Sequence, residues 1–399
     1  MDCVSAGFRV STPKKKSRCE QDESIFKAYQ KSLYQWVVHG IRGLRKKTDG
    51  PGEMVSGFKD EIRGFGHPMT PEELAAVNAF RDLNGRPPLI GSPAVRFLSY
   101  GKNKDGYWTY EHFASQVVDI LDMYEALYPG VQILIEVDWS SGHSKHRKDA
   151  LSVNAMAVTF GGRQSIPHAS KLVDGCVADG AKLKVGEMQY MYFRSVEERQ
   201  AAGEVGEDGQ PVTTPDPPPW YKPHLSPDEY VGQAKGKKQV AWERGMWKDG
   251  MIEKVDEDDA KGRDQSMSLN HVLSSCPDFR AEKPALQSLV EARGHILVMS
   301  PKGHCELAGD GIEYDWGKMK QTFRRKNKYV KFHELILESM SRRALPLSTS
   351  RKFARKARAY RRAYREGVDN VHACIEKMVK KFKAHRNAKD FAKAFIQSS

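Results

Sequence analysis

Helical and extended patterns of apolar residues alternate along this chain. A helical period predicts a helix over 111–128, whose apolar side chains are Phe113, Val117, Ile120, Leu121, Tyr124, Leu127 and Tyr128. Residues 131–137 are mostly apolar and predict a buried strand that runs into Asp138. Further strands are expected at 34–39, 53–58 and 295–299, and further helices at 284–294 and from Gly311 through Lys320 or beyond. This succession predicts an α/β fold in which helices flank a mixed sheet.

Two polar stretches interrupt that succession. Residues 201–221 are rich in Gly, Pro, Asp and Thr, and residues 254–265 are almost wholly polar, so neither is expected to form a regular element. A long irregular stretch inside a compact domain usually marks an insertion or a functional loop. We therefore expect a core in two parts, 22–157 and 266–335, separated by an insertion domain over 158–265.

The C-terminal region, 336–399, is dense in Lys and Arg. Within it Phe353, Ala357, Tyr360 and Tyr364 recur at helical spacing, which predicts a helix that ends at Gly367, and residues 372–383 predict another. In one interpretation the aromatic stripe packs on the core while the charges lie in water. In the other, the cationic faces bind phosphate groups, and both can hold for one helix.

Charge and composition narrow the class of protein. The 399 residues include 64 Lys and Arg against 51 Asp and Glu, a net charge of +13, which suits a polyanionic partner such as nucleic acid. The longest apolar stretches are far shorter than the ~20 residues that cross a bilayer, which argues against a membrane protein. The six cysteines are scattered without a Cys-x-x-Cys pair, which fits a reducing compartment.

The first residues are basic rather than apolar. We expect 1–21 to be a basic, disordered leader, because no apolar core of a secretory signal follows Met1. The run from Pro13 to Arg18 is either a nuclear address or a solvated surface cluster, and the expected location is the nucleus.

Two acidic residues stand where sites form in α/β proteins. Asp138 follows a predicted strand, and Glu313 falls in the first turn of a predicted helix. Each has an ordinary structural explanation, since Asp often opens turns and an acid pairs well with a helix N-terminus. Together they could converge on divalent cations, and two such ions roughly 3.5–4 Å apart promote phosphoryl transfer.

At these positions the chain resembles a known family. Its strand, Asp138, small turn and His143, followed later by Ser300-Pro301, Glu306-Leu307, Ile312-Glu313, Trp316-Gly317 and Lys320, are similar to the second and third motifs of DDE transposases of the mariner-type superfamily and of larger transposon-derived chains. The family has Asn-Pro where this chain has the longer bridge 308–311. The resemblance implies an RNase H-like fold and gives the catalytic role to Glu313, with Glu306 and Asp315 as weaker substitutes.

The first motif is carried by residues 20–26, which resemble the His-Asp-Glu-Ser-x-Phe opening of the larger relatives and give the first acid as Asp22. In the family this Asp lies on the first, central strand. Residues 11–21 are polar and basic, a poor central strand, so we expect either a lost strand or a damaged sheet. The family's N-terminal helix-turn-helix reader also has no room here.

The resemblance implies a DNA transposase, or a nuclease derived from one, in which Asp22, Asp138 and Glu313 hold two Mg²⁺ or Mn²⁺ ions. Expected partners are transposon-end and target DNA and a second copy of the chain. The candidate DNA contacts are Lys318, Lys320, Arg324, Arg325, Arg355, Arg358 and Arg362.

Three alternatives stay open. The first is a transposon relic that binds DNA without cutting it, and the second is an enzyme that cuts RNA–DNA hybrids or branched DNA. The third is a zinc site, for which the candidate ligands are His271, Cys276, His295, His304 and Cys305. His143 could orient Asp138, contact phosphate or serve only the structure.

Overall fold

The computed structural model describes residues 15–29, 50–101, 103–140, 142–206, 208–255, 264–302, 304, 306–325 and 331–365. The predicted strand at 34–39, the predicted helix at 372–383, Gly367 and residues 1–14 of the predicted leader lie outside the described residues, as does Cys305. The chain divides into two compact units: residues 1–145 with 286–399, and residues 146–285. The first unit is α/β, with a mixed sheet flanked by helices.

Six strands form the sheet of the first unit. They are β1 (Lys16–Lys27), β2 (Gly52–Asp60), β3 (Gly64–Phe65), β4 (Val95–Leu98), β5 (Gln132–Val137) and β8 (Ile296–Met299). The order is β3-β2-β1-β5-β8, and β4 also pairs with β2. The pairings of β2 with β1, β3 and β4 are antiparallel, whereas β1–β5 and β5–β8 are parallel. The first strand is therefore central.

The prediction for the N-terminal segment was wrong. Residues 16–21 belong to β1, so the expectation of a disordered leader through residue 21 and of a lost or damaged first strand does not hold. Polarity misled the prediction because the charged side chains of β1 find partners far away in the sequence. Arg18 lies 3.4 Å from Asp310 and 3.9 Å from Glu136, while Cys19 is buried in the apolar core on the other face.

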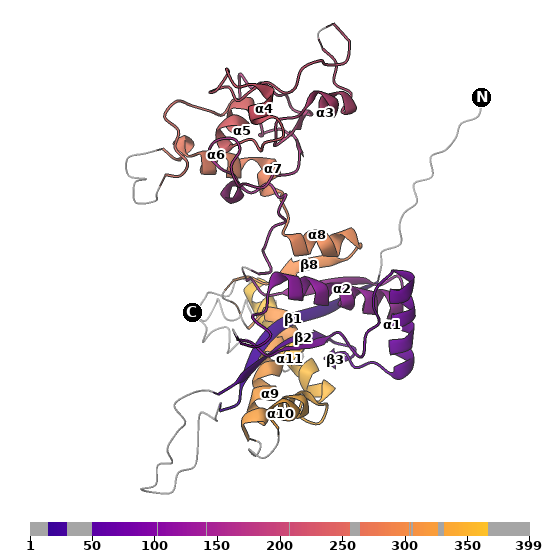
Figure 1. The fold of residues 1–399 in the computed structure, drawn as a ribbon. Helices are drawn as coiled ribbons and strands as arrows, with labels where there is room; N and C mark the ends of the chain where they lie inside the picture. Colours follow the sequence, from indigo (N-terminus) through magenta and orange to yellow (C-terminus); the bar gives the residue numbers. More distant parts are fainter. Residues whose placement is uncertain are drawn as a thin grey trace, which may run out of the picture. The chain divides into compact units, whose positions relative to one another are not determined.

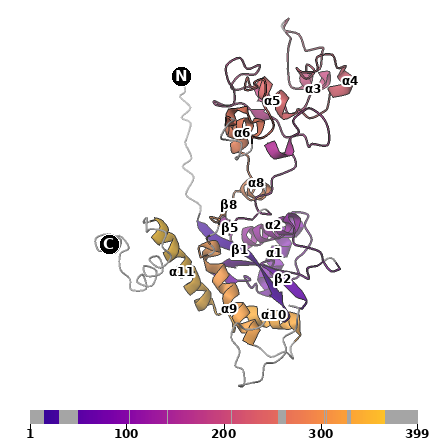
Figure 2. The same cartoon turned by 90° about the vertical axis from the view of Figure 1, so that its left-hand side faces the viewer.

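Helices cover both faces of this sheet (Figures 1 and 2). On one side lie α1 (Pro71–Leu83), α2 (Tyr110–Leu127) and α8 (Ala285–Ala292). The other side carries α9 (Ile312–Arg325), α10 (Phe332–Met340) and α11 (Leu347–Arg365), with the short turn η4 (Ala308–Gly311) before α9. Each side has its own apolar cluster, one around α2 and β5, the other around Phe26, Trp316 and Phe323.

The periodicities predicted these elements well. The helices expected at 111–128, 284–294 and after Gly311, and the strands expected at 53–58, 131–137 and 295–299, are confirmed as α2, α8, α9, β2, β5 and β8. The predicted C-terminal stripe lies on α11, where Ala357 and Tyr360 are buried. None of the described helices is long and apolar enough to cross a membrane.

The second unit interrupts the first between β5 and β8. Its regular elements are η1 (Val153–Ala155), β6 (Ser170–Lys171), β7 (Met188–Gln189), α3 (Val196–Ala201), α4 (Pro227–Tyr230), α5 (Lys237–Glu243), η3 (Gln265–Met267), α6 (Leu269–Ser275) and α7 (Pro277–Arg280). An insertion was expected at 158–265, and the unit found, 146–285, extends beyond it at both ends. The reason is that its apolar core recruits Leu151, Met156 and Phe279 from outside the predicted bounds.

Candidate metal and phosphoryl-transfer site

The carboxyl end of β5 and the middle of β1 bring two carboxylates together. The parallel register pairs Glu20 with Glu136, and continuing it by two residues sets Asp22 opposite Asp138. Since side chains alternate along a strand, Glu20 and Asp22 share one sheet face. This is the face that α9 and α11 cover.

Glu313 comes from α9, whose rotation is fixed by packing. Ile312, Trp316 and Met319 are buried in the apolar cluster beneath the sheet, and the Trp316 ring meets Phe65 edge-on at 4.8 Å between ring centroids. Glu313 is the second residue of α9, so the burial of its neighbour Ile312 brings it to the edge of this cluster. The helix predicted after Gly311 is therefore present, and these buried side chains anchor it.

The three acids are close enough to affect one another's ionisation. Burial raises the pKa of Asp22 well above its usual value, and the charges of Glu313 and Asp138 raise it further. Burial also raises the pKa of Glu313, opposed by Lys320 and supported by Asp138. Among the described residues neither Asp22 nor Glu313 forms an ion pair with a Lys or Arg side chain. The charges of the three predicted acids thus act on one another, and Asp22 and Glu313 lack a Lys or Arg partner among the described residues. Asp138 is paired with His143, and the three acids are not a group whose ligand atoms all lie within 4.8 Å of one another.

Lys320 lies at the rim of this cluster. Burial lowers the pKa of its ammonium group and Arg324 lowers it further, whereas Glu313 and Asp22 raise it. Lys320 and Arg324 are one helical turn apart on α9 and so share a face. Among the cations predicted to contact DNA, Lys320 is thus the one that interacts with the acids, and Arg324 in turn interacts with Lys320.

A second constellation shares Asp138. Glu23, Asp138 and His143 each offer one ligand atom, and these atoms all lie within 4.8 Å of one another, so the group could hold a metal ion. His143 Nδ1 is 2.8 Å from Asp138 Oδ1, and its Nε2 is 3.6 Å from Glu23 Oε1. Glu23 lies on the opposite face of β1 from Asp22, and the turn after β5 lets Asp138 stand between them.

The two carboxylates favour the charged form of His143. Burial opposes a charged imidazole, but hydrogen bonds to Asp138 and Glu23 outweigh it and raise the pKa of His143 to about 10. The ring is 4.4 Å from that of Phe113, measured between centroids. A histidinium here pairs with two carboxylates and balances one of their two charges, and any metal ion at this position must first displace its proton. These contacts fit two of the roles left open for His143, orientation of Asp138 and a purely structural role.

One member of this constellation, Glu23, was not among the candidate residues predicted from the sequence. Glu23 accepts hydrogen bonds from Trp108 Nε1 at 3.1 Å and from Gln21 Nε2 at 2.8 Å. Gln21 falls in the segment that carried the resemblance, but a strand assignment was needed to see that the adjacent acids Asp22 and Glu23 lie on opposite faces of β1. The period of two along β1 would have revealed it.

The weaker substitutes for Glu313 have other partners. Asp315 is fully buried, lies 2.7 Å from Lys59 Nζ and accepts a hydrogen bond from Ser350. Glu306 accepts hydrogen bonds from Tyr364 at 2.7 Å and from His304 at 2.9 Å. Neither carboxylate joins the cluster around Asp138, which leaves Glu313 as the third acid.

The remaining candidate DNA contacts fall into two groups. Arg325, Arg355 and Arg362 are exposed, and Lys318 is partly buried. Arg358 instead forms ion pairs with Asp310 and Glu61, each at 2.5 Å, so its charge is already engaged within the protein. The proposed zinc ligands form no constellation of three within the described part of the chain.

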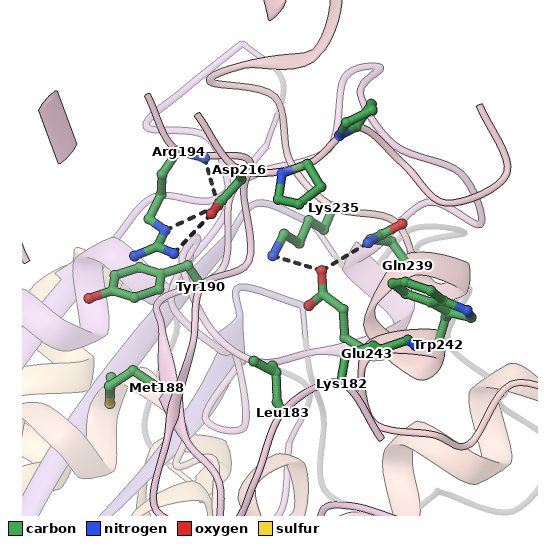
Figure 3. A pocket seen from close by; sticks show the side chains of 12 residues that line it. Lys182, Leu183, Met188, Tyr190, Arg194, Asp216, Lys235, Gln239, Trp242 and Glu243 are labelled. Carbon is green, nitrogen blue, oxygen red and sulfur yellow. Dashed lines mark hydrogen bonds and ion pairs between the residues drawn. The ribbon is translucent and has the colours of Figure 1, made fainter. Parts of the chain in front are cut away.

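The insertion unit has a cavity of its own, of about 300 Å³ (Figure 3). Its polar lining is paired internally: Arg194 binds Asp216 at 2.9 Å, and Glu243 accepts from Lys235 and Gln239, each at 2.9 Å. The figure shows these two networks side by side, with the rings of Tyr190 and Trp242 flanking them. This closed pairing indicates a structural network.

The chain was compared with protein-family models, with curated proteins and with solved structures, and nothing matched it in any of the three. The function must therefore be argued from the site.

Proposed function

We propose that this chain is a DDE-type DNA transposase, or a nuclease derived from one, that cleaves phosphodiester bonds with two divalent cations. The observation that carries the proposal is the convergence of Asp22, Asp138 and Glu313, from a central strand, a strand end and a helix, into one cluster of mutually interacting carboxylates. The position of Asp22 on the first, central strand supports an RNase H-like core.

The donor set fits hard divalent cations. Burial and neighbouring carboxylates raise the pKa values of Asp22 and Glu313, and neither forms an ion pair with a described Lys or Arg. With Asp138 they offer oxygen ligands, which Mg²⁺ and Mn²⁺ prefer. When bound, such ions activate a water or hydroxyl nucleophile and stabilise the leaving oxygen of an in-line displacement. Asp22, Asp138 and Glu313 would hold them.

The protein's own contribution would be placement and charge. His143 orients the Asp138 carboxylate through its 2.8 Å contact. Lys320 and Arg324 would meet the DNA backbone beside the site, and Arg355 and Arg362 would add phosphate contacts from α11. DNA and a second copy of the chain are the proposed partners.

We propose the nucleus as the location of the protein, because its DNA substrate is there. The basic run from Pro13 to Arg18 is not wholly available as an address, because residues 16–18 are the first of β1.

The alternative is a relic that binds DNA without cutting it. The expectation of a lost or damaged first strand favoured this alternative, and the presence of β1 removes that argument. The alternative keeps its place because binding requires only the basic surface, whereas cutting requires all three acids.

The deciding experiment is a nicking assay on supercoiled plasmid in about 1–10 mM Mn²⁺. The plasmid carries the genomic flanks of the gene. We expect nicked product from the wild type, none from Asp138→Asn or Glu313→Gln, and undiminished product from the exposed control Glu334→Gln. A labelled RNA–DNA hybrid in parallel reveals the hybrid-cutting alternative. Salt-sensitive DNA binding with no product from the wild type would support the relic and overturn the proposal.

A further inference from the structure

The turn that leads into the Glu313 helix has an unusual backbone. In η4, Gly309 and Asp310 have φ values of 51° and 45°, and Gly311 has a φ of 88°. The left-handed region is readily adopted by glycine but costs conformational energy for Asp. Among the described residues only His67 and Asp310 are non-glycine residues with positive φ. Some surrounding interaction must hold Asp310 in this conformation.

The interaction comes from the basic helix α11. The Asp310 carboxylate is fully buried and accepts hydrogen bonds from Arg358 Nε at 2.8 Å and from Arg361 Nη1 at 3.0 Å. Lys59 Nζ donates to the Asp310 carbonyl oxygen at 3.3 Å. The turn is therefore fixed through both its side chain and its backbone.

Arg361 binds the same turn at a second point. It donates to the Leu307 carbonyl oxygen at 2.6 Å and to the Glu136 carboxylate on β5. It thus joins three elements: β5, which ends at the residue before Asp138, the segment before η4, and α11. Arg362, the next residue, is exposed.

Close packing leaves the turn little freedom. A Cβ atom added to Gly311 would lie 2.6 Å from the carbonyl oxygen of Phe353 on α11, and one added to Gly309 would lie 3.3 Å from Glu20 Cβ on β1. The turn is pressed between the central strand and α11. Glu313 follows Gly311 by two residues.

We propose that Arg358 and Arg361 are positioning residues for Glu313: by clamping Asp310 they fix the turn 308–311 and hence the place where α9 begins. The inference rests on the proposed function for the role of Glu313. It concerns residues 308–311, where this chain differs from the motif it resembles. In this proposal α11, which is expected to bind DNA, also helps to position the acids.

The test compares two neighbours that carry the same charge. Arg361→Gln and Arg362→Gln each remove one cation from α11, so loss of DNA attraction alone would affect both equally. We expect Arg361→Gln to require roughly 10–100-fold more Mn²⁺ for half-maximal nicking, with the rate recovered at saturating Mn²⁺, because residues that orient metal ligands have effects of this size. Arg362→Gln should weaken DNA binding but keep the wild-type Mn²⁺ concentration for half-maximal nicking, measured at saturating DNA.

Two further variants separate the clamp from general stability. Asp310→Gly keeps the left-handed turn but removes the carboxylate, and we expect it to behave like Arg361→Gln. Arg361→Lys keeps a charge and should recover part of the Mn²⁺ affinity, and it serves as the test variant if Arg361→Gln does not fold. Equal Mn²⁺ requirements for wild type, Arg361→Gln and Asp310→Gly would overturn the inference.

Hydrogen exchange on the full-length protein separates this inference from the proposed function. Amides of residues 311–316 should exchange at least about tenfold faster in Arg361→Gln than in Arg362→Gln, without DNA or metal. If the wild type fails to nick DNA, the proposed function fails, and the exchange result alone decides whether the clamp exists. Equal exchange in the two variants sinks the clamp whatever the wild type does.

Discussion

Two layers of carboxylates lie on one face of the sheet and come from the same three segments. The upper layer is Asp22, Asp138 and Glu313, and the lower layer is Glu20, Glu136 and Asp310. Each lower residue precedes its upper counterpart by two or three positions. Arg18, Arg358 and Arg361 contact the lower layer, whereas no described Lys or Arg forms an ion pair with Asp22 or Glu313.

The difference between the layers is the placement of cations. In the lower layer, arginines of α11 form ion pairs with buried acids of β5 and η4 and so connect the three elements. In the upper layer, Asp138 is paired with His143, but Asp22 and Glu313 form no ion pair with a described Lys or Arg, so an external cation could balance their charge. A cluster of acids alone does not indicate a metal site. The proposal of a metal site therefore depends on Asp22 and Glu313, which lack the arginine partners that the lower layer has.

Even the lower layer has an incompletely balanced member. Neither carboxylate oxygen of Glu20 has a hydrogen-bond partner among the described residues. Burial and the charge of Asp310 raise the pKa of Glu20 well above its usual value, and Lys59 opposes them. We infer that Lys59, itself buried, is the cation on which this layer depends most.

Removing that cation should give the largest effect on stability. Lys59→Met leaves the buried Asp315 without its 2.7 Å partner, and breaking a buried ion pair typically costs about 3–5 kcal/mol. Urea denaturation of the full chain measures the loss. The double variant Lys59→Met with Asp315→Leu should recover most of it. A single variant as stable as the wild type would show that the fold does not depend on the Lys59–Asp315 ion pair.

Metal ions should distinguish the layers next. Mn²⁺ at about 100 times its dissociation constant should stabilise the wild type by about 2.7 kcal/mol, since only the folded state binds it. Asp22→Asn should lose this gain. In EDTA the same variant should be more stable than the wild type by on the order of 1 kcal/mol, because it removes a buried uncompensated charge. Differential scanning calorimetry with and without Mn²⁺ would show both effects.

The pH dependence follows from the raised pKa values of Asp22 and Glu313. A carboxyl whose pKa is higher in the folded than in the unfolded state contributes stability below its unfolded pKa, 3.8 or 4.5 here, and loses it as the pH rises through the folded pKa. In EDTA, the variant with Asp22→Asn and Glu313→Gln should therefore gain stability over the wild type as the pH rises above about 4.5. A difference that stays constant from pH 4 to pH 8 would argue against uncompensated acids.

Exposed cations should matter least to stability. Arg362→Gln should change the free energy of unfolding by less than about 0.5 kcal/mol. Its effect should instead appear in DNA binding, where the slope of log K against log salt falls by about 0.9 if the side chain meets a phosphate. An unchanged slope, measured by fluorescence anisotropy with labelled duplex, would remove Arg362 from the DNA surface.

The sequence predicted the elements whose signal is periodic. Apolar spacing gave α2, β5, β8 and α9, and the resemblance gave the three acids. The sequence failed on β1, whose charged residues resemble a solvated segment until Asp310 and Glu136 are seen beside Arg18. Polarity indicates exposure only when partners are local.

The candidate site was predicted in part for the same reason. The positions of the acids can be read from strand ends and helix starts. The neutralisation of one layer and not the other depends on ion pairs between residues hundreds of positions apart, such as Arg361 with Glu136. His143 and Glu23 likewise become partners only when β1 is placed beside β5.

The most direct test is Mn²⁺ binding to two variants of one strand, Asp22→Asn and Glu20→Gln, measured by isothermal titration calorimetry on the full chain without DNA. Both changes remove one carboxylate from the same face of β1, two residues apart. Our account predicts that Glu20→Gln binds Mn²⁺ like the wild type and that Asp22→Asn loses at least about tenfold in affinity. Full Mn²⁺ affinity in Asp22→Asn, or loss in Glu20→Gln alone, would contradict it.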